Sequence, residues 1–417
     1  MNLQAQRTGD LRVVSVIGVV LIATLAVIYM ISQTLRNSIG VIAPDLAAEL
    51  GLSAAQLGTL SSAFFISFAL AQIPLGVALD RFGPKLCMLV CTAIVVVGAA
   101  WFAMAATPTG LILARALIGL GSSCYLMAPL AFYARRFAPE RFATLAGLQL
   151  GLGTIGTVVA TAPLAFSAAT LGWRGTFFVI AGAMVAAGIL VALVLPSDRP
   201  VLAAAPRETL RESLAGTLAA ARTPSVAPLF LMQLAAYSSF VLIVGLWGGP
   251  YLTHVYGYGL TDRGDLLFLA AVGQNIALIL NGPIERLIGS YKRFVLLGSG
   301  STMIMLLVLA AVGTLPMGGL PLWLFAFGLL SGYTPVLIAH GQTLFPPALI
   351  GRGLTLLNIG TMAGVFLSQL LTGMIVNLFP DGAYPSLAYR VVFALQAGFL
   401  LLAILPYLRV QDAVNIK

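Results

Sequence analysis

The sequence predicts an all-α membrane protein of twelve transmembrane helices, arranged as two six-helix bundles. Of its 417 residues, 60% are hydrophobic and only 8% are charged, whereas an ordinary soluble domain has about 25% charged residues. Long apolar runs recur along the whole chain, and a polar motif in the first half is echoed in the second. Lipid therefore replaces water around most of this chain, and the repeat indicates two similar bundles.

Each transmembrane helix needs about 20 largely apolar residues. Runs of this kind lie at 14–43, 55–79, 86–106, 109–134, 142–168, 174–195, 227–252, 265–284, 294–313, 320–344, 353–379 and 390–408. The longest polar interruption, 196–225, separates an N-terminal bundle (1–195) from a C-terminal bundle (226–417). The second part of this linker predicts a short amphipathic helix at the membrane surface.

The basic residues set the expected orientation, because short cytoplasmic loops are enriched in Lys and Arg. With the N-terminus inside, 17 of the 22 basic residues lie in cytoplasmic segments and three, Arg174, Arg263 and Arg390, lie outside. Two more, Arg36 and Arg115, fall inside spans. We therefore expect a multi-pass inner-membrane protein whose termini and linker are cytoplasmic.

Composition and motifs exclude several function classes. The net charge of +9 is scattered in small groups between apolar runs, so it does not indicate nucleic-acid binding. The sequence has no P-loop, no Cys/His metal-ligand spacing and no nucleophile–base arrangement. We expect no enzyme activity, no cofactor and no metal. The expected partners are the lipid bilayer and a small molecule, and the expected state is a monomer.

Two polar loops carry the internal repeat. The first follows the second span and contains Gly76, Asp80, Arg81, Gly83 and Lys85. The second occupies the equivalent place after the eighth span and contains Glu285 and Arg286. A carboxylate such as Asp80 is attracted to the positive end of a helix, and one is expected to start near 351–353. Arg81 and Lys85 can pair with Asp80 or with lipid phosphates. The plainer alternative is a solvated turn with ordinary cytoplasmic charges.

The first loop resembles the signature of the major facilitator superfamily: a glycine, three residues, Asp-Arg, one residue, a glycine, one residue and a basic residue. The resemblance covers essentially the whole chain and is typical of bacterial members. It implies two bundles that rock about a site at the membrane midplane, with both loops acting in gating. Arg115, in the run Arg115-Ala-Leu-Ile-Gly119-Leu-Gly121, resembles a second motif of that superfamily, so we assign it to the gating set. Trp173 and Trp247 lie in runs that resemble further motifs, or else anchor the chain at the membrane interface.

The first span contains a polar stripe. Tyr29, Ser32, Gln33 and Arg36 follow one another at spacings of three and four residues and so share one helical face. A charge inside a span is expensive and usually faces a cavity, and a guanidinium suits a carboxylate or phosphonate. The stripe therefore predicts an anion site with Arg36 as its anchor. The alternative is that Arg36 snorkels to the outer interface.

The same stretch resembles the anion:cation symporter family within the superfamily, in which an arginine lies about fifteen residues before a glycine, as Arg36 does before Gly51. This resemblance implies an organic anion as substrate, often moved with protons. The chain departs from the pattern in two places. The residue before the arginine is Leu35, where an acid is common, and helix 4 offers Ser122, Ser123 and Cys124 in place of a glutamate.

Other polar residues in the spans are candidates for the same site or for helix–helix hydrogen bonding. With Arg36, Tyr29 and Gln33, the predicted substrate-binding set contains Tyr125, Tyr237, Gln274 and Asn275. The coupling ion is expected to be H⁺ or Na⁺. However, all 13 acidic residues fall in loops or at span ends. His340 is a candidate proton carrier, or a hydrogen-bonded histidine near the interface.

Three hypotheses follow. The first is a secondary transporter that moves a small organic anion across the inner membrane by alternating access, with ion-coupled uptake. The second is a drug- or metabolite-efflux antiporter of the same fold. The third, from another class, is a membrane receptor or scaffold that transports nothing.

Overall fold

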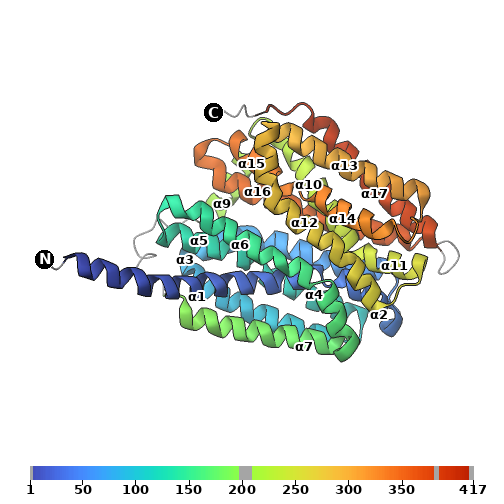
Figure 1. The fold of residues 1–417 in the computed structure, drawn as a ribbon, viewed down its shortest axis with the longest axis horizontal. Coiled ribbons are helices and arrows are strands. Elements are labelled where there is room, and N and C mark those ends of the chain that lie inside the picture. Colours follow the sequence, from blue (N-terminus) through green and yellow to red (C-terminus); the bar gives the residue numbers. More distant parts are fainter. Residues whose placement is uncertain (1–2, 197–208, 380–384, 413–417) are drawn as a thin grey trace.

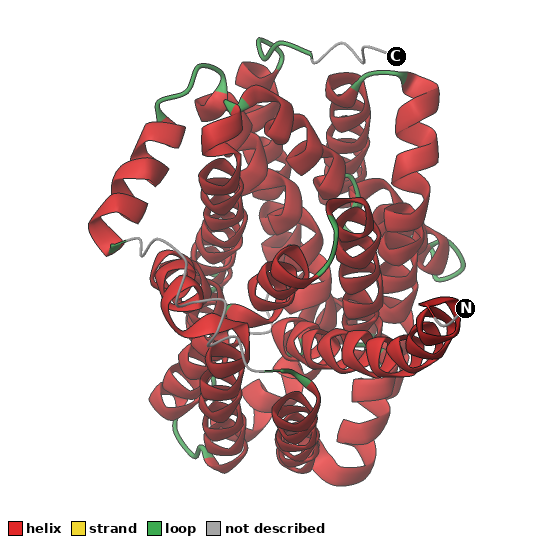
Figure 2. Ribbon diagram, turned by 90° about the vertical axis from the view of Figure 1, so that its left-hand side faces the viewer, coloured by secondary structure: helices red, strands yellow, loops and turns green. Residues whose placement is uncertain are grey.

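The computed structural model describes residues 3–196, 209–379 and 385–412. Within these ranges the chain is helical, with turns and short loops and no β-strand (Figures 1 and 2). The first bundle consists of α1 (Leu3–Asn37), α2 (Ile39–Leu50), α3 (Ala54–Met104), α4 (Pro108–Ser122), α5 (Cys124–Arg136), α6 (Pro139–Val159) and α7 (Ala162–Val194). The fold class predicted from the sequence is confirmed.

The second bundle contains one π-helix, η1, and one short 3-10 helix, η2. Its elements are α10 (Val226–Leu242), η1 (Ile243–Trp247), α11 (Gly248–Tyr256), α12 (Leu260–Ile288), α13 (Tyr291–Val312), α14 (Leu320–Ser331), α15 (Thr334–Leu344), η2 (Pro347–Leu349), α16 (Ile350–Val376) and α17 (Pro385–Tyr407). Several spans are made of two or three of these elements end to end.

The described residues contain eleven helical stretches that are long and apolar enough to cross a membrane. One of them, α3, has 51 residues and is broken at Gly83, whose φ of 81° is favourable only for glycine. Because α3 therefore holds two of the predicted spans, the stretches are consistent with twelve. α7 is broken in the same way at Gly172, with φ 70°.

The linker helix is α9 (Leu210–Ala221). Thr209 and Glu212 form a capping box at its start, each side chain bonding the other residue's backbone N–H. The predicted short helix is therefore present, and it packs against α3 of the first bundle and α16 of the second. The first part of the linker, 197–208, lies outside the described residues.

The two bundles repeat the same contacts between helix ends. Arg174 donates to the carbonyls of Ala103 and Ala105, and Arg390 donates to those of Ala310 and Ala311. Guanidinium groups thus satisfy the unpaired C-terminal carbonyls of α3 and α13. At the opposite end of each bundle, Lys85 donates to the backbone carbonyls of Ala192 and Leu195, and Lys292 donates to that of Leu408. These pairs show that the sequence repeat is also a repeat of structure.

The bundles meet closely at the end of the molecule where α2 and α11 lie, on the right of Figure 1. We call this end the α11 side and the opposite end the α9 side. Arg263 of α12 is only 3% exposed, forms an ion pair with Asp45 of α2, and donates from Nε to the carbonyl of Val41 at 2.7 Å. A Cβ atom on Gly40 would lie 1.9 Å from the carbonyl oxygen of Val244. These contacts join the two bundles directly.

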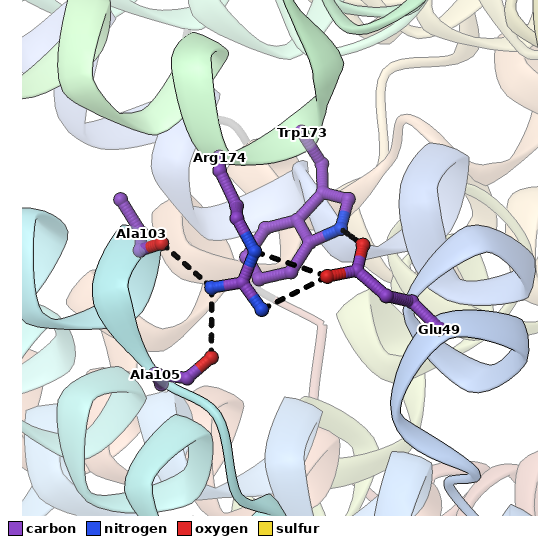
Figure 3. Close-up of polar contacts among 5 residues, drawn as sticks. All are labelled: Glu49, Ala103, Ala105, Trp173 and Arg174. Carbon is purple, nitrogen blue, oxygen red and sulfur yellow. Dashed lines mark hydrogen bonds and ion pairs between the residues drawn. The ribbon is translucent and has the colours of Figure 1, made fainter.

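Glu49, Trp173 and Arg174 form a polar cluster on the α11 side (Figure 3). The Trp173 indole donates to one carboxylate oxygen of Glu49 at 2.5 Å, and Arg174 donates two hydrogen bonds to the other. The hydrogen bond from Trp173, with the adjacent Arg174, holds the pKa of the Glu49 carboxyl below its ordinary value. The cluster ties the end of α2 to the kink of α7.

We expect Glu49→Gln to lower the melting temperature of the purified protein at neutral pH and to leave it unchanged in acid. Because the folded-state pKa lies below the unfolded value of about 4.3, this stabilisation is full above that value and disappears as the pH falls through the folded-state pKa. The pair is partly exposed, so the loss is small, roughly 0.2–1 kcal/mol. Melts of wild type and variant between about pH 7 and about pH 3 measure it. Asp265→Asn, at an exposed carboxylate, is the control. A difference that persists in acid would contradict the assignment.

Candidate functional site between the bundles

Arg36 lies at the end of α1 and is only 6% exposed. Its guanidinium carbon lies 4.8 Å from the ring centroid of Phe68 and 5.8 Å from that of Phe64. These cation–π contacts stabilise the charge but use none of its N–H groups. Within the described part of the chain the side chain of Arg36 makes no hydrogen bond or ion pair, and its Nε atom is buried without a partner. The side chain therefore does not snorkel to the interface, and it holds a cation with free donors.

Arg115 is fully buried on α4 and lies beside Arg36. It donates to the carbonyls of Leu35 at 2.5 Å and Arg36 at 2.7 Å, and its guanidinium carbon lies 4.8 Å from the Phe64 ring centroid. These carbonyls belong to the end of α1, where the helix breaks before α2. Arg115 thus caps the C-terminus of α1 and positions the backbone that carries Arg36.

Several further polar side chains that the structure describes have buried nitrogen or oxygen atoms without a hydrogen-bond partner. Seven of them, which belong to helices of both bundles, are called with Arg36 the interbundle cluster: Ser32, Gln33, Asn37, Ser61, Ser122, Gln233 and Gln369. The first five come from α1, α3 and α4, and the last two from α10 and α16. A Cβ on Gly245 of η1 would lie 3.6 Å from the Asn37 Oδ1 and from the Gln369 Nε2. Side chains of both bundles therefore approach one another here.

Buried polar atoms normally have partners, and leaving them unpaired is costly. Unpartnered side chains on helices of both bundles, with a buried guanidinium among them, are best explained by a polar ligand or water. The arrangement offers positive charge, aromatic faces, hydroxyls and amides. It can bind an anion at Arg36 and hydrogen-bond the rest of a small polar molecule from both bundles.

The structure places the other predicted substrate-binding residues at different distances from this cluster. Tyr29 is 4% exposed and interacts electrostatically with Arg36 and with Tyr237 of α10. The hydroxyl of Tyr125 donates to Thr92, within the first bundle. Asn275 donates to Ala271 of its own helix. Gln274 is 9% exposed on α12. Of these, Tyr29 lies near Arg36 and Tyr237 lies near Tyr29, and the assignment of all five to a substrate site stays a prediction.

The predicted gating loop forms the turn between the two spans of α3. Gly83 makes the break, and Gly76 is half-buried one turn before Asp80. Asp80 forms an ion pair with Arg135 at the end of α5, at 2.9 Å, with both side chains partly exposed. Arg81 is exposed, with its guanidinium carbon 5.4 Å from the Phe82 ring centroid. Arg135 was not singled out by the sequence, and it links the loop to the end of α5.

We expect Asp80→Asn to slow transport while leaving substrate affinity and folding close to wild type. The variant removes the ion pair with Arg135, and an exposed pair contributes up to about 1 kcal/mol. If that energy stabilises only one state of the cycle, rates change by up to about fivefold. Initial uptake rates in proteoliposomes measure the effect, with Asp262→Asn, at the exposed start of α12, as the matched control. Equal rates for wild type and Asp80→Asn would leave this carboxylate as an ordinary loop charge.

The second copy of the motif ends α12. Gly289 closes that helix in the left-handed conformation, with φ 67°. Arg286 is exposed and Glu285 is half-buried. The turn is therefore the counterpart of the turn at Gly83, although the gating assignment of Glu285 and Arg286 stays a prediction.

Two alternatives raised by the sequence are wrong. Trp173 is 5% exposed and Trp247 is 1% exposed. Trp173 donates to Glu49, and Trp247 donates to Thr372 at 2.8 Å. Both are interior side chains and neither anchors the chain at a lipid interface, because each indole N–H finds a protein partner.

His340 is fully buried on α15. Its Nδ1 atom is hydrogen-bonded to the Tyr407 hydroxyl at 2.6 Å, and its Nε2 atom to the carbonyl of Gln411 at 3.0 Å. With both ring nitrogens engaged, His340 matches the hydrogen-bonded alternative. Its partners come from the end of α17 and the residues that follow, so it ties the end of the second bundle together.

Sequence reasoning missed Asn37, Gln233, Phe64 and Phe68 as site residues. Phe64 and Phe68 are four residues apart on one face of α3, which is also the spacing of ordinary core residues. Asn37 follows Arg36 directly, and Gln233 lies one turn before Tyr237. Only Asn37 and Gln233 could have been identified from the sequence, because each places a polar amide inside an apolar span.

Comparison with known proteins agrees with this fold. Residues 25–301 match the sequence model of the Major Facilitator Superfamily. The chain belongs to that superfamily. Solved members share the fold at low identity: the nucleoside transporter NupG has a TM-score of 0.76 at 15% identity, covering 93% of this chain and 98% of NupG. A D-xylose–proton symporter has a TM-score of 0.70 at 14% identity, covering 92% and 96% of the two chains.

Curated superfamily relatives divide into two kinds. A probable sulfoacetate transporter of Cupriavidus necator is 30% identical over 38% of this chain and 37% of its own length. A probable L-galactonate transporter of Escherichia coli is 30% identical over 35% of this chain and 32% of its own length. A chloramphenicol resistance protein of Streptomyces lividans is 26% identical over 84% of this chain and 89% of its own length. The chain thus matches about a third of the two anion-transporter relatives and most of the resistance protein.

Proposed function

We propose that this superfamily member is a secondary transporter that carries a small organic anion across the bacterial inner membrane by alternating access, in the direction of uptake. One observation carries the proposal. The side chain of Arg36 is a buried cation without a hydrogen bond or ion pair among the described residues, and its guanidinium lies against the Phe64 and Phe68 rings. A carboxylate or sulfonate would supply the missing charge and the missing acceptors.

The relatives support the same substrate class. Two of them are named for sulfoacetate and L-galactonate, which are small organic anions. We further propose that the α9 side and both termini face the cytoplasm, as the distribution of basic residues indicates. In that orientation the contacts between Asp45 and Arg263 close the outer end.

A second candidate is efflux of a drug or metabolite. The observation that favours it is the chloramphenicol resistance protein, which matches most of this chain. Efflux of a neutral drug would leave the Arg36 charge without a partner, so we rank it second. Gln233 and Gln369 suit either substrate.

A thermal-shift screen of the purified protein against organic anions and neutral drugs tests the proposal. A ligand that binds the folded state raises the melting temperature by mass action, by the equivalent of about 2.7 kcal/mol at a hundred times Kd. Sulfoacetate, L-galactonate, glucuronate and chloramphenicol are the first probes. Stabilisation by an anion alone is the expected result. Stabilisation by chloramphenicol alone would favour efflux and overturn the anion assignment.

A further inference from the structure

We infer that the transporter works by anion exchange, returning through the membrane with a second anion bound, because the unpaired charge of Arg36 opposes the return of the empty protein. The inference rests on the proposed function and adds its coupling mechanism. It is an alternative to the proton or sodium coupling that the sequence led us to expect, and the experiment below distinguishes the two.

The charge balance between the bundles is one-sided. Arg36 and Arg115 are both at least 94% buried, touch the same Phe64 ring and interact electrostatically. The carbonyls of α1 partly balance Arg115, whereas Arg36 has only aromatic faces. The acidic side chains that the structure describes lie near helix ends, at the turn of α3 or in loops, except Asp45 in the middle of α2: Asp45, Glu49, Asp80, Glu212, Asp262, Asp265, Glu285 and Asp412.

The acids nearest in sequence to Arg36 are already engaged. Asp45 pairs with Arg263 on the α11 side, and Glu49 bonds Trp173 and Arg174. His340, the other candidate titratable group, has both ring nitrogens hydrogen-bonded in the second bundle. Within the described chain, therefore, no side chain is placed to neutralise Arg36 when the site is empty.

Alternating access requires a state in which the site is closed to both sides. For an empty protein, that closure removes water from an unpaired guanidinium, and burying an unpaired ion is strongly unfavourable. With an organic anion bound, the two charges neutralise each other and the anion occupies the free donors. Closure therefore costs less free energy for the loaded protein than for the empty one. A bound anion shifts the protein towards the closed state.

A cation would not solve this problem. Na⁺ bound beside Arg36 adds a second positive charge and needs oxygen ligands with negative character. A proton needs a base, and the interbundle cluster offers serines, amides and a guanidinium. A second anion does neutralise the positive charge of Arg36, if it binds while the site returns to the other side of the membrane.

The test compares uptake of a radiolabelled anion into two sets of proteoliposomes. One set contains the same anion without label, and the other contains only potassium chloride and buffer. Labelled sulfoacetate or glucuronate, whichever the thermal-shift screen identifies, is the probe, with potassium and valinomycin holding the membrane potential at zero. We expect uptake into the anion-loaded set to be roughly tenfold faster or more, as a desolvated unpaired charge implies, with or without inward proton and sodium gradients.

A substitution in the same helix tests the charge itself. Gln33 lies three residues before Arg36 on one face of α1, and its Oε1 atom is buried without a partner. Gln33→Glu is nearly isosteric and places a carboxylate beside the guanidinium. We expect it to weaken anion binding and to bring the ratio of loaded to empty uptake towards one. Gln33→Met removes the same amide and adds no charge, so it should slow uptake into both sets of vesicles alike without bringing their ratio towards one.

The outcomes separate the two proposals. Equal wild-type uptake into loaded and empty vesicles, or uptake that an inward proton or sodium gradient accelerates, would overturn exchange and leave anion transport standing. No thermal shift and no uptake with any anion would overturn the proposed function itself. If Gln33→Glu does not fold, the wild-type comparison still decides.

Discussion

Replacing Arg36 by glutamine is expected to weaken binding of the organic anion by about 30-fold to several-thousand-fold. Removing one partner of a desolvated charge pair costs roughly 2–5 kcal/mol, which corresponds to that range in Kd. Arg36→Lys keeps the charge but loses the planar pair of donors and the contact with two aromatic rings. It is therefore expected to bind weakly as well, though better than Arg36→Gln.

The measurement is anion affinity by titration of the melting temperature, with each variant first shown to fold. Arg211→Gln, an exposed arginine on α9, is the matched control and should bind like wild type. Arg115→Gln removes a second buried positive charge, but one that supports the backbone of α1. Because it loses two hydrogen bonds to the end of α1, this variant should melt at a lower temperature. Equal affinity of wild type, Arg36→Lys and Arg36→Gln would remove the main support for an anion site.

Replacing Gly40 by alanine is expected to keep the bundles apart on the α11 side. The added Cβ would lie 1.9 Å from the carbonyl oxygen of Val244, far inside van der Waals contact, and backbone atoms cannot move aside as a flexible side chain can. Overpacking of this kind costs about 1–3 kcal/mol, so the population closed on the α11 side should fall roughly 5- to 150-fold relative to the open one. The helix itself tolerates alanine well.

Reactivity of a single cysteine reports this opening. Val41→Cys, in a chain without Cys87, Cys91 and Cys124, places the thiol at a fully buried position whose carbonyl accepts from Arg263. In detergent, a maleimide should react with it faster when Gly40 is alanine. Gly182→Ala is the control, because a Cβ at that position meets nothing within 4 Å. Unchanged labelling would show that the bundles accommodate the methyl group without separating.

Much of the fold was predictable because lipid imposes simple rules on sequence. A span needs a certain length of apolar residues, so the linker helix α9 and the break at Gly83 could be placed without coordinates. The repeat after the second and eighth spans predicted two similar bundles. The matching bonds of Lys85 and Lys292 could not be predicted, because their acceptors are backbone carbonyls more than 100 residues away.

The site was predictable only in part. The spacing of Tyr29, Gln33 and Arg36 showed one polar face of α1, because helical periodicity is local. The side chains that lie near that face include Phe64 and Phe68 of α3 and Tyr237 of α10, and no spacing within the chain identifies them. In the sequence, Arg115 and Arg36 are both arginines inside apolar spans. In the structure, Arg115 donates to backbone carbonyls, whereas Arg36 has free donors. That difference depends on which groups lie within about 3 Å, which is a property of packing.

The sequence by itself determined that this chain crosses a membrane many times, that its two bundles are related, and that α1 carries a charge in an apolar span. Hydrophobicity, charge counts and helical periodicity depend only on residues that are close in sequence, so they can be evaluated without coordinates. Packing decided that the Arg36 side chain has no polar partner among the described residues, that Arg115 is engaged, and that Gln369 of the second bundle approaches the same point as Asn37 of the first. Hydrogen-bond partnership is exclusive and short-ranged, so only the packed arrangement of the two bundles assigns it.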